Sequence, residues 1–367
     1  MKTTVADLFS GVGGLSYGFA ARTEFDLVFA NEIDPVIASA YSANHPSVKM
    51  VNCDIAALTS EVLAEAAPHG VDLVVGGPPC QSYSTLGSRR MDARAMLFKE
   101  YRRVLSVLRP SMFVFENVTG LLSMDHGRLF PAVRREFEDE GYELLHRVVD
   151  AAQYGVPQHR ERVLLVGVRN GIRFRFPDPD HGSESVPYVT VADAFADLPP
   201  LHCGEGASEY ASEPCNDFLR FVRAGGGPLT EHHVPSCSAK LVRIMESLGD
   251  GQGKNCLPES IRPKSGFGNS YAKMWWGRPS PTVTRNFATP SSARCIHPRD
   301  SRPLTIREGA RLQSFPDSYE FRGTDGKKRL EIGNAVPPLL SLAIAREAAA
   351  AFAMCREEGD VCDRYHK

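Results

Sequence analysis

Short apolar runs alternate with amphipathic segments through the first half of the chain. Each run is rich in Val, Ile, Leu or Phe, ends near a Gly, Pro or Asp, and is followed by apolar residues at helical spacing. Strands that are buried on both faces and joined by crossover helices give this pattern, so the sequence predicts an α/β protein with a mostly parallel sheet. The predicted strands are residues 4–9, 27–31, 48–52, 72–75, 112–116, 144–150 and 162–168, and the clearest helices are residues 94–108 and 128–140.

The pattern changes after about residue 187. Residues 187–301 are rich in Gly, Pro, Ser, His and Cys and have few periodic runs, which predicts a smaller, loop-rich domain. Helical spacing returns at residues 305–313 and 338–354, and the last helix is apolar enough to pack onto the first domain. We therefore predict a large domain of residues 1–186 and 324–367, with a small domain of residues 187–323 inserted into it.

Composition narrows the classes of function. The 367 residues include 42 basic and 44 acidic side chains, and a net charge of -2 predicts no general affinity for polyanions, so any nucleic-acid contact must come from local basic clusters. No run reaches the roughly 18 apolar residues of a membrane span, and the start lacks a signal region, which predicts a cytoplasmic protein with no membrane contact. The nine cysteines are scattered and form no Cys-x-x-Cys pair, which predicts reduced thiols and no bound metal.

A glycine-rich turn follows the first predicted strand. Gly11, Gly13 and Gly14 lead into a helix at the place where an open α/β sheet binds ligands. Glu32 closes the second strand about 20 residues later, where a carboxylate can accept both hydroxyls of a ribose. Ser16 replaces the third glycine of a dinucleotide fingerprint, so the pattern favours an adenosine cofactor without a pyrophosphate over a nicotinamide or a flavin. A tight strand-to-helix connection without a ligand is the alternative.

A second acidic residue follows the third predicted strand. Asp54 is placed to accept a hydrogen bond from an adenine amino group, while Ile55 packs on the ring. Taken alone, Asp54 is more typical of a helix cap.

A cysteine and a glutamate follow the next two strands. Cys80 lies in the turn Gly-Gly-Pro-Pro-Cys-Gln-Ser, whose prolines stiffen the chain. Most cysteines are small core residues, but a polar and rigid turn is a poor place for one. Glu116 ends the neighbouring apolar strand, where a charge is costly unless it is paired or used. Arg160 and Arg162 are placed to hold Glu116 or a substrate oxygen, with a solvated charge run as the alternative.

A thiol, a carboxylate and an adenosine cofactor together fit the alkylation of an electron-poor ring carbon. Carbon 5 of cytosine becomes nucleophilic when a thiolate adds to carbon 6, and it can then attack the methyl sulfonium of S-adenosylmethionine. In this interpretation Cys80 is the nucleophile, and Glu116 acts at ring nitrogen N3 as an acid or hydrogen-bond partner. The ring atoms are inaccessible inside a duplex, so the base must be flipped out.

The order of these motifs resembles that of the DNA (cytosine-5) methyltransferases. The resemblance covers residues 1 to about 200 and about 270 to 340, and it implies a class I methyltransferase fold with an inserted target-recognition domain. It also implies S-adenosylmethionine as the methyl donor, S-adenosylhomocysteine as the product and double-stranded DNA as the substrate. The matching segments are residues 7–14, 31–34, 77–82, 116–118, 158–162, 307–317 and 333–338.

Site residues follow from the resemblance position by position. Cys80 is similar to the nucleophile, Glu116 to the group on N3, and Arg160 and Arg162 to the pair that supports that carboxylate and the flipped cytosine. For Arg307 and Arg311, a structural role and a phosphate contact are equally open. The cofactor pocket implied by the resemblance consists of Phe9, Gly11, Gly14, Glu32, Ile33, Asp54, Ile55 and Asn334.

The resemblance also implies a segment, residues 82–98, that closes over the flipped base. Its predicted DNA contacts are Ser84, Arg89, Arg90 and Arg94, and a flexible surface loop is the alternative. Basic and aromatic residues interleave between residues 254 and 285, which suits a surface facing a DNA groove, although Trp275 and Trp276 are interpreted as mainly structural.

The leading hypothesis is therefore methylation of one short duplex sequence by a monomeric enzyme located with the nucleoid. Such an enzyme belongs to a restriction-modification or regulatory system, in which any cognate restriction endonuclease acts separately. An RNA methyltransferase on the same scaffold and a DNA-binding protein without catalysis are the alternatives. A nicotinamide oxidoreductase is a more distant one.

Overall fold

A computed structural model describes residues 2–79, 97–264 and 268–365, with side chains as far as residue 357. Two compact units make up the chain. Unit 1 contains Met1–Asp150, Glu161–Asp178 and Leu340–Lys367, and unit 2 contains Ala151–Arg160 and Pro179–Leu339. Residues 151–160, 179–186 and 324–339, which the sequence assigns to the large domain, thus group with the small one.

Unit 1 is built on a seven-stranded sheet in the order β3-β2-β1-β4-β5-β7-β6. The first five strands of that order pair in parallel, and β7 runs antiparallel to both β5 and β6. This confirms the prediction of a mostly parallel α/β fold of the class I methyltransferase type. The strands are β1 (Thr3–Leu8), β2 (Phe25–Asn31), β3 (Lys49–Val51), β4 (Leu73–Gly76), β5 (Met112–Val118), β6 (Glu143–Asp150) and β7 (Glu161–Val168).

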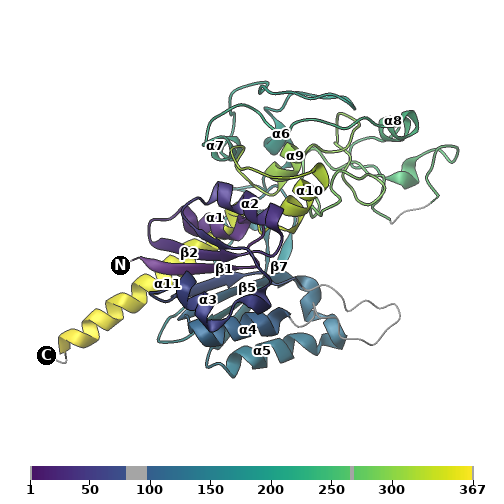
Figure 1. Cartoon of the computed structure of the whole chain (residues 1–367). Helices are drawn as coiled ribbons and strands as arrows, with labels where there is room; N and C mark the ends of the chain where they lie inside the picture. Colours follow the sequence, from purple (N-terminus) through teal and green to yellow (C-terminus); the bar gives the residue numbers. More distant parts are fainter. Residues whose placement is uncertain (1, 80–96, 265–267, 366–367) are drawn as a thin grey trace. The chain divides into compact units, whose positions relative to one another are not determined.

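Helices cover both faces of this sheet (Figure 1). On one face, α3, α4 and α5 pack over a core that includes Phe113, Phe115 and Phe137, and on the other lie α1, α2 and α11. The α-helices of unit 1 are α1 (Gly14–Ala20), α2 (Pro35–Asn44), α3 (Ser60–Ala66), α4 (Leu97–Leu108), α5 (Leu129–Glu138) and α11 (Pro338–Tyr365). Short 3-10 turns are η1 (Ile55–Ala57), η3 (Thr119–Leu122) and η4 (Met124–Gly127).

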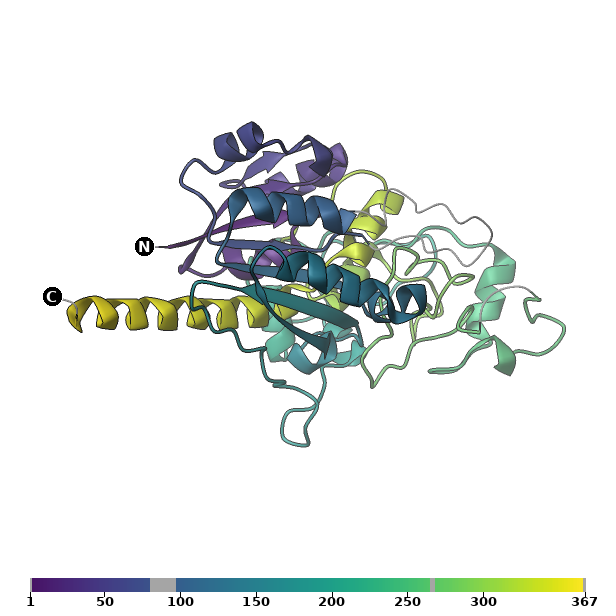
Figure 2. The same cartoon turned by 90° about the horizontal axis from the view of Figure 1, so that it is seen from below.

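The C-terminal helix α11 is a core helix for part of its length. Leu340, Ile344 and Ala348 are fully buried, and the Ser341 hydroxyl binds the backbone of α1, accepting from Gly18 N at 3.0 Å. Both views show the helix running along the sheet and then extending beyond it (Figures 1 and 2). Its length and composition would suit a membrane span, but burial of its apolar residues identifies it as part of the core.

Unit 2 consists mainly of loops, as the sequence predicts. Isolated β-bridges such as Gly206–His233 join them, and buried ion pairs lie in its interior together with apolar side chains. Arg311 illustrates this, since its guanidinium lies 2.6 Å from the Asp317 carboxylate with both side chains buried. The helical elements of unit 2 are η5 (Ala151–Tyr154), α6 (Val191–Phe195), α7 (Asp217–Val222), α8 (Ala239–Glu246), η6 (Lys254–Cys256), α9 (Ile306–Leu312) and α10 (Asp325–Asn334).

Candidate active site

The carboxyl ends of the parallel strands meet at one edge of the sheet in unit 1. Leu8 at the end of β1 pairs with Asn31 on β2 and with Gly76 on β4, and Gly76 pairs with Phe115 on β5. The loops that follow these strands carry the glycine turn, Glu32, the Gly77–Pro79 segment and Glu116. Register therefore brings together residues that are more than 100 positions apart in the sequence.

The glycine turn after β1 has a left-handed backbone at three positions. Phe9, Gly11 and Gly13 have φ values of 56°, 55° and 97°. Gly11 and Gly13 adopt this conformation at no steric cost, whereas Phe9 is strained by it, as residues at ligand sites often are. The turn is held by hydrogen bonds from Ser10 N to Asn31 O and from Gly13 N to Ser10 O, both 3.0 Å. The turn is therefore a fixed, largely buried connection, in which Phe9 and Gly11 are half-buried.

Glu32 is bound to this turn by its carboxylate. Gly11 N donates to Oε2 at 3.0 Å and Asp34 N donates to Oε1 at 2.8 Å. Burial raises the pKa of Glu32, and the two amides lower it in part. A carboxylate has about four acceptor positions, so two backbone donors leave capacity for further hydroxyl donors.

Two asparagines fix the loop after β3 against the end of β2. Asn31 donates through Nδ2 to Val51 O and Cys53 O, both at 2.9 Å, and Asn52 donates to Glu32 O at 2.7 Å. Asp54 accepts from Ala56 N at 2.9 Å with one oxygen, Oδ1, and so begins the η1 turn. This is the cap that its sequence context favours.

The two isoleucines of the predicted cofactor pocket have opposite environments. Ile33 is 62% exposed, which is unusual for a large apolar side chain next to a glycine turn. Ile55 is 3% exposed and belongs to the core cluster beneath the sheet edge. Ile33 is therefore available to pack on a ring, whereas Ile55 packs in the core, and its contact with the adenine ring stays a prediction.

Glu116 and Arg162 form an ion pair on one face of the sheet. Arg162 lies opposite Val118 in the antiparallel β5–β7 ladder, so its side chain shares a face with Glu116. Arg162 Nε lies 2.7 Å from Glu116 Oε1, and both side chains are 11% exposed. The prediction that an arginine of this cluster holds Glu116 is confirmed for Arg162.

The segment that leads toward Cys80 approaches Glu116 closely. A Cβ on Gly77 would lie 2.8 Å from Glu116 Oε2, closer than real Cβ contacts, so any larger residue there would push the carboxylate out of this position. Asn117 Nδ2 donates to Pro78 O at 2.9 Å and ties the Pro-Pro turn to β5. Cys80, Ser84, Arg89, Arg90 and Arg94 lie outside the described residues.

Arg160 has different partners from those expected for it. Its side chain is 1% exposed, and in unit 2 it donates to Val283 O at 3.0 Å, Gly333 O at 3.0 Å and Ala335 O at 2.9 Å. A buried guanidinium needs several acceptors, and these carbonyls provide them. Arg160 thus holds the backbone on both sides of Asn334, whose own side chain is exposed. The expected support of Glu116 comes from Arg162.

Arg307 and Arg311, for which two roles were open, are both fully buried. Arg311 binds Asp197 and Asp317, and Arg307 donates to Thr230 Oγ1 at 2.8 Å. Their role is structural, because buried side chains with these partners do not reach a phosphate.

Sequence reasoning missed a buried polar group beneath the glycine turn. The Asp7 carboxylate accepts from the Ser16 hydroxyl at 2.6 Å, and the Ser16 oxygen lies 2.8 Å from the Tyr41 hydroxyl. Burial, the largest cause, raises the pKa of Asp7 to about 7, Ser16 lowers it and Glu32 raises it. An aspartate in the middle of an apolar strand was the available signal.

The sheet topology and the residues at its carboxyl edge together define a class I methyltransferase fold, the class that uses S-adenosylmethionine. The sequence model for C-5 cytosine-specific DNA methylases matches residues 3–350, and the chain belongs to that family. Among curated proteins it is 35% identical to Type II methyltransferase M1.HphI of Haemophilus parahaemolyticus, over 94% of this chain and 86% of that protein. It is 32% identical to Type II methyltransferase M.AgeI of Thalassovita gelatinovora, over 94% and 98% of the two chains.

Solved structures agree with this assignment. A candidate DNA modification methyltransferase encoded within an E. coli prophage has a TM-score of 0.78 at 25% identity and covers 96% of this chain and 100% of its own. A Dnmt2 methyltransferase of S. pombe, at 19% identity and a TM-score of 0.56, covers 94% of this chain and 98% of its own and supports the fold alone. The resemblance found in the sequence is confirmed.

Proposed function

We propose that this chain transfers a methyl group from S-adenosylmethionine to carbon 5 of a cytosine flipped out of duplex DNA, at one short recognition sequence. The observation that carries the proposal is the Glu116–Arg162 ion pair at 2.7 Å, next to Gly77 and the turn that leads to Cys80. It supplies a positioned carboxylate at the sheet edge where class I methyltransferases act, and family membership identifies the ring it serves.

The residues around the glycine turn fit an adenosine cofactor. Glu32 has acceptor capacity for the ribose hydroxyls, and Ile33 offers an exposed apolar surface to the adenine ring. Asp54, with Oδ1 engaged by Ala56 N, would accept from the adenine amino group through Oδ2. Phe9, Gly11, Gly14 and Ile55 complete the proposed cofactor-binding residues of unit 1, and the family resemblance adds Asn334 as a residue that contacts the cofactor. When bound, S-adenosylmethionine supplies an electrophilic methyl group.

The chemistry then depends on Cys80 and Glu116. The Cys80 thiol passes its proton to solvent, and its thiolate forms a bond to carbon 6 of the cytosine. Glu116 in its protonated form donates a hydrogen bond or its proton to N3, and it recovers that proton when the thiolate is eliminated. Electron density moved to carbon 5 makes that atom the nucleophile toward the methyl group. Loss of the proton from carbon 5 then drives elimination of the Cys80 thiolate and restores the aromatic ring. Arg162 keeps the Glu116 carboxylate in one orientation throughout.

DNA binding follows the same proposal. Ser84, Arg89, Arg90 and Arg94 contact the DNA near the flipped base, and unit 2 reads the recognition sequence. The enzyme acts as a monomer in the cytoplasm, on DNA of the nucleoid, within a restriction-modification or regulatory system in which a cognate endonuclease is a separate protein. Names of the curated relatives as Type II methyltransferases support this setting.

Bisulfite sequencing of plasmid DNA from expressing cells tests the proposal. The wild-type chain is expected to protect cytosines within one shared motif, and Cys80→Ala is expected to protect none. Cys215→Ala, which removes a cysteine that is free and exposed in unit 2, is the control and keeps full protection. Soluble wild-type protein that protects no cytosine, or a Cys80→Ala variant that protects as well as the wild type, contradicts the proposed function.

A further inference from the structure

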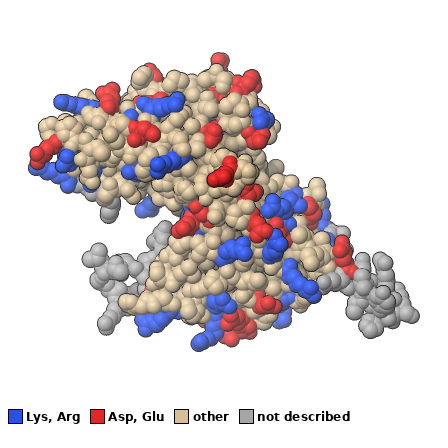
Figure 3. Space-filling model, turned by 180° about the vertical axis from the view of Figure 1, so that it is seen from behind, with Lys and Arg blue, Asp and Glu red and all other residues tan. Residues whose placement is uncertain are grey.

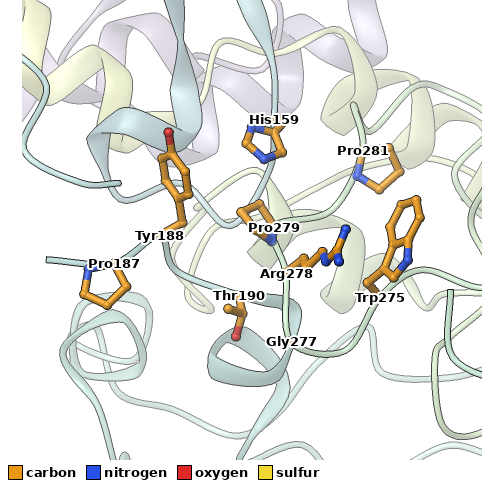
Figure 4. A pocket seen from close by; sticks show the side chains of 9 residues that line it. All are labelled: His159, Pro187, Tyr188, Thr190, Trp275, Gly277, Arg278, Pro279 and Pro281. Carbon is orange, nitrogen blue, oxygen red and sulfur yellow. The ribbon is translucent and has the colours of Figure 1, made fainter. Parts of the chain in front are cut away.

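Unit 2 contains a pocket of about 600 Å³ that the proposed reaction does not use. Its volume lies within the range of about 300–1,000 Å³ that is typical of small-molecule sites. The lining is largely apolar and aromatic, and the nine described residues around it include no acidic side chain (Figure 4). They are His159, Pro187, Tyr188, Thr190, Trp275, Gly277, Arg278, Pro279 and Pro281.

Backbone hydrogen bonds between three distant segments form this pocket in advance of any ligand. His159 N donates to Ser280 O at 2.9 Å and Val191 N donates to Arg278 O at 3.0 Å, which joins residues 157–160, 187–191 and 275–281. Three prolines stiffen the same segments. A pre-formed pocket costs little conformational entropy on binding.

Trp275 is held in place as one wall. Arg294 stacks on its ring at 4.1 Å from the centroid and in turn donates to Gly251 O at 2.8 Å. The indole also lies against Gly251, where a Cβ would be 2.1 Å from its nitrogen. His159 and Tyr188, in edge-to-face contact at 5.4 Å, form another part of the lining.

Arg278 adds a positive charge to these aromatic walls. Its guanidinium lies 5.7 Å from the Trp275 ring, and the residue is exposed. Aromatic side chains beside an arginine suit a planar heterocycle that carries an anionic group, since the rings stack with the heterocycle and the guanidinium binds the anion. Nucleotides have this combination of a flat base and a phosphate.

We propose that this pocket binds an unstacked nucleobase of the nucleic-acid substrate, with the adjoining phosphate on Arg278. The choice of DNA as the source rests on the proposed function, whereas the shared chemistry, a base with a 5′-phosphate, rests on the pocket alone. An unstacked base held here contributes affinity without reading sequence, because every base has a face that can stack.

Tryptophan fluorescence provides a direct test, because the chain has two tryptophans and both are in this region. Trp276→Phe leaves Trp275 as the sole tryptophan of the full chain, and excitation at the red edge of the indole band selects it over the 11 tyrosines. A single-stranded DNA hexanucleotide is expected to quench it saturably, dAMP is expected to quench it with weaker affinity, and deoxyribose 5-phosphate and inorganic phosphate are expected to leave it unchanged.

Variants in the Trp276→Phe background separate stacking from charge. Tyr188→Ala and Arg278→Ala are each expected to weaken hexanucleotide binding about tenfold, within the range for loss of one stacking or cation partner. Tyr188→Phe, which retains the ring, and Arg299→Ala, which removes an exposed arginine near Trp276, are the matched controls and keep wild-type affinity.

Three outcomes overturn the pocket proposal: no saturable quenching, equal quenching by deoxyribose 5-phosphate, or unchanged affinity in Tyr188→Ala and Arg278→Ala. Stronger binding of dAMP than of the hexanucleotide assigns the pocket to a free nucleotide and contradicts DNA as its source. Bisulfite protection by the Trp276→Phe protein is measured in parallel, so failure of the methylation proposal is seen separately from failure of the pocket proposal.

Discussion

At the scale of single residues, two neighbours restrict the position of the Glu116 carboxylate. Arg162 engages Oε1 at 2.7 Å, and Gly77 faces Oε2 with no side chain. A carboxylate held in this way has little freedom to rotate, so its orientation toward a substrate ring is set before binding. The glycine is therefore as much a part of the site as the arginine.

Replacing Gly77 by alanine is expected to disturb the site without unfolding the protein. The new Cβ would lie 2.8 Å from Glu116 Oε2, and the carboxylate can move away only by weakening its ion pair with Arg162. We expect the single-turnover rate of methyl transfer to fall about 100-fold, the lower part of the range for general acid–base catalysis.

Gly120→Ala is the matched control, because its added Cβ would have only ordinary contacts at 3.9 and 4.0 Å. It should keep the wild-type rate. Equal rates for Gly77→Ala and the wild type would show that the position of Glu116 does not limit the reaction.

Asp7 makes stability depend on pH. Its folded-state pKa of about 7 is above its usual value of 3.8, so the folded protein binds a proton that the unfolded chain releases. Stability is then fully present below about pH 4 and is lost as the pH rises through about 7. Asp7→Asn removes the titrating group and should abolish this loss.

Urea unfolding at pH 5 and pH 8 measures the effect. The free energy of unfolding of the wild type should fall by up to about 2.7 kcal/mol more than that of Asp7→Asn, because about two pH units of this interval lie below the folded-state pKa of about 7 and each is worth about 1.4 kcal/mol. Parallel changes in the two proteins would show that Asp7 titrates normally in the folded state.

At the scale of elements, Arg160 stabilises the segment that carries Asn334. Its nitrogens bind carbonyls on both sides of Asn334 and a third at Val283. The nearby Gln158 side chain accepts from Val283 N at 2.6 Å and donates to Leu312 O at 3.0 Å. The observed contacts of Arg160 thus fix the backbone around Asn334 within unit 2.

Arg160→Lys should separate this structural role from a catalytic one. A lysine keeps the charge but cannot reach three carbonyls, so we expect a loss of about 2–3 kcal/mol in unfolding free energy, the range for hydrogen bonds from a charged donor. KM for S-adenosylmethionine should rise more than kcat falls, and amides around residues 332–336 should lose protection from hydrogen exchange.

Arg175→Lys, which alters an ion pair whose side chains are 74% and 67% exposed, should change none of these values. A selective fall in kcat for Arg160→Lys, with normal exchange protection, would instead support the direct catalytic role that the resemblance implies.

Local patterns predicted elements well and long-range partners poorly. The predicted strands 112–116 and 162–168 lie within two residues of β5 and β7, because burial on both faces leaves a clear apolar run. The role of Arg160 and its grouping with unit 2 were not predicted, since they depend on carbonyls at residues 283, 333 and 335 that no local pattern connects to it. The contact of Gly77 with Glu116 and the buried environment of Asp7 were not predicted either, because strand register brings their neighbours close from distant parts of the sequence.

On the scale of the whole molecule, the charge distribution limits the source of DNA affinity, and the order of segments along the chain limits which fragments can fold. Basic and acidic side chains are interspersed over the described residues of the face seen in Figure 3, as a net charge of -2 leads one to expect. DNA affinity must therefore come from local groups rather than from a general field. Each compact unit is also assembled from separate stretches of chain, so neither is complete in one continuous fragment.

The dependence of unit 1 on the distant helix α11 can be tested with fragments. Residues 1–178 contain every strand of the sheet but lack α11, whose Leu340, Ile344 and Ala348 are fully buried in the intact protein. Each large apolar side chain of this kind contributes about 1.5–3 kcal/mol on burial, so a fragment of residues 1–178 is expected to expose its core and aggregate.

Joining residues 338–365 to that fragment through a flexible linker should restore a soluble protein with a cooperative thermal transition, because the helix again covers its face of the sheet. The same fusion with Ile344→Asp and Ala348→Asp carries equal length but places two charges in the buried face, and it should remain aggregated. A fragment of residues 1–178 that melts cooperatively as a monomer would mean that the sheet and its first five helices suffice, and that α11 only extends an already complete core.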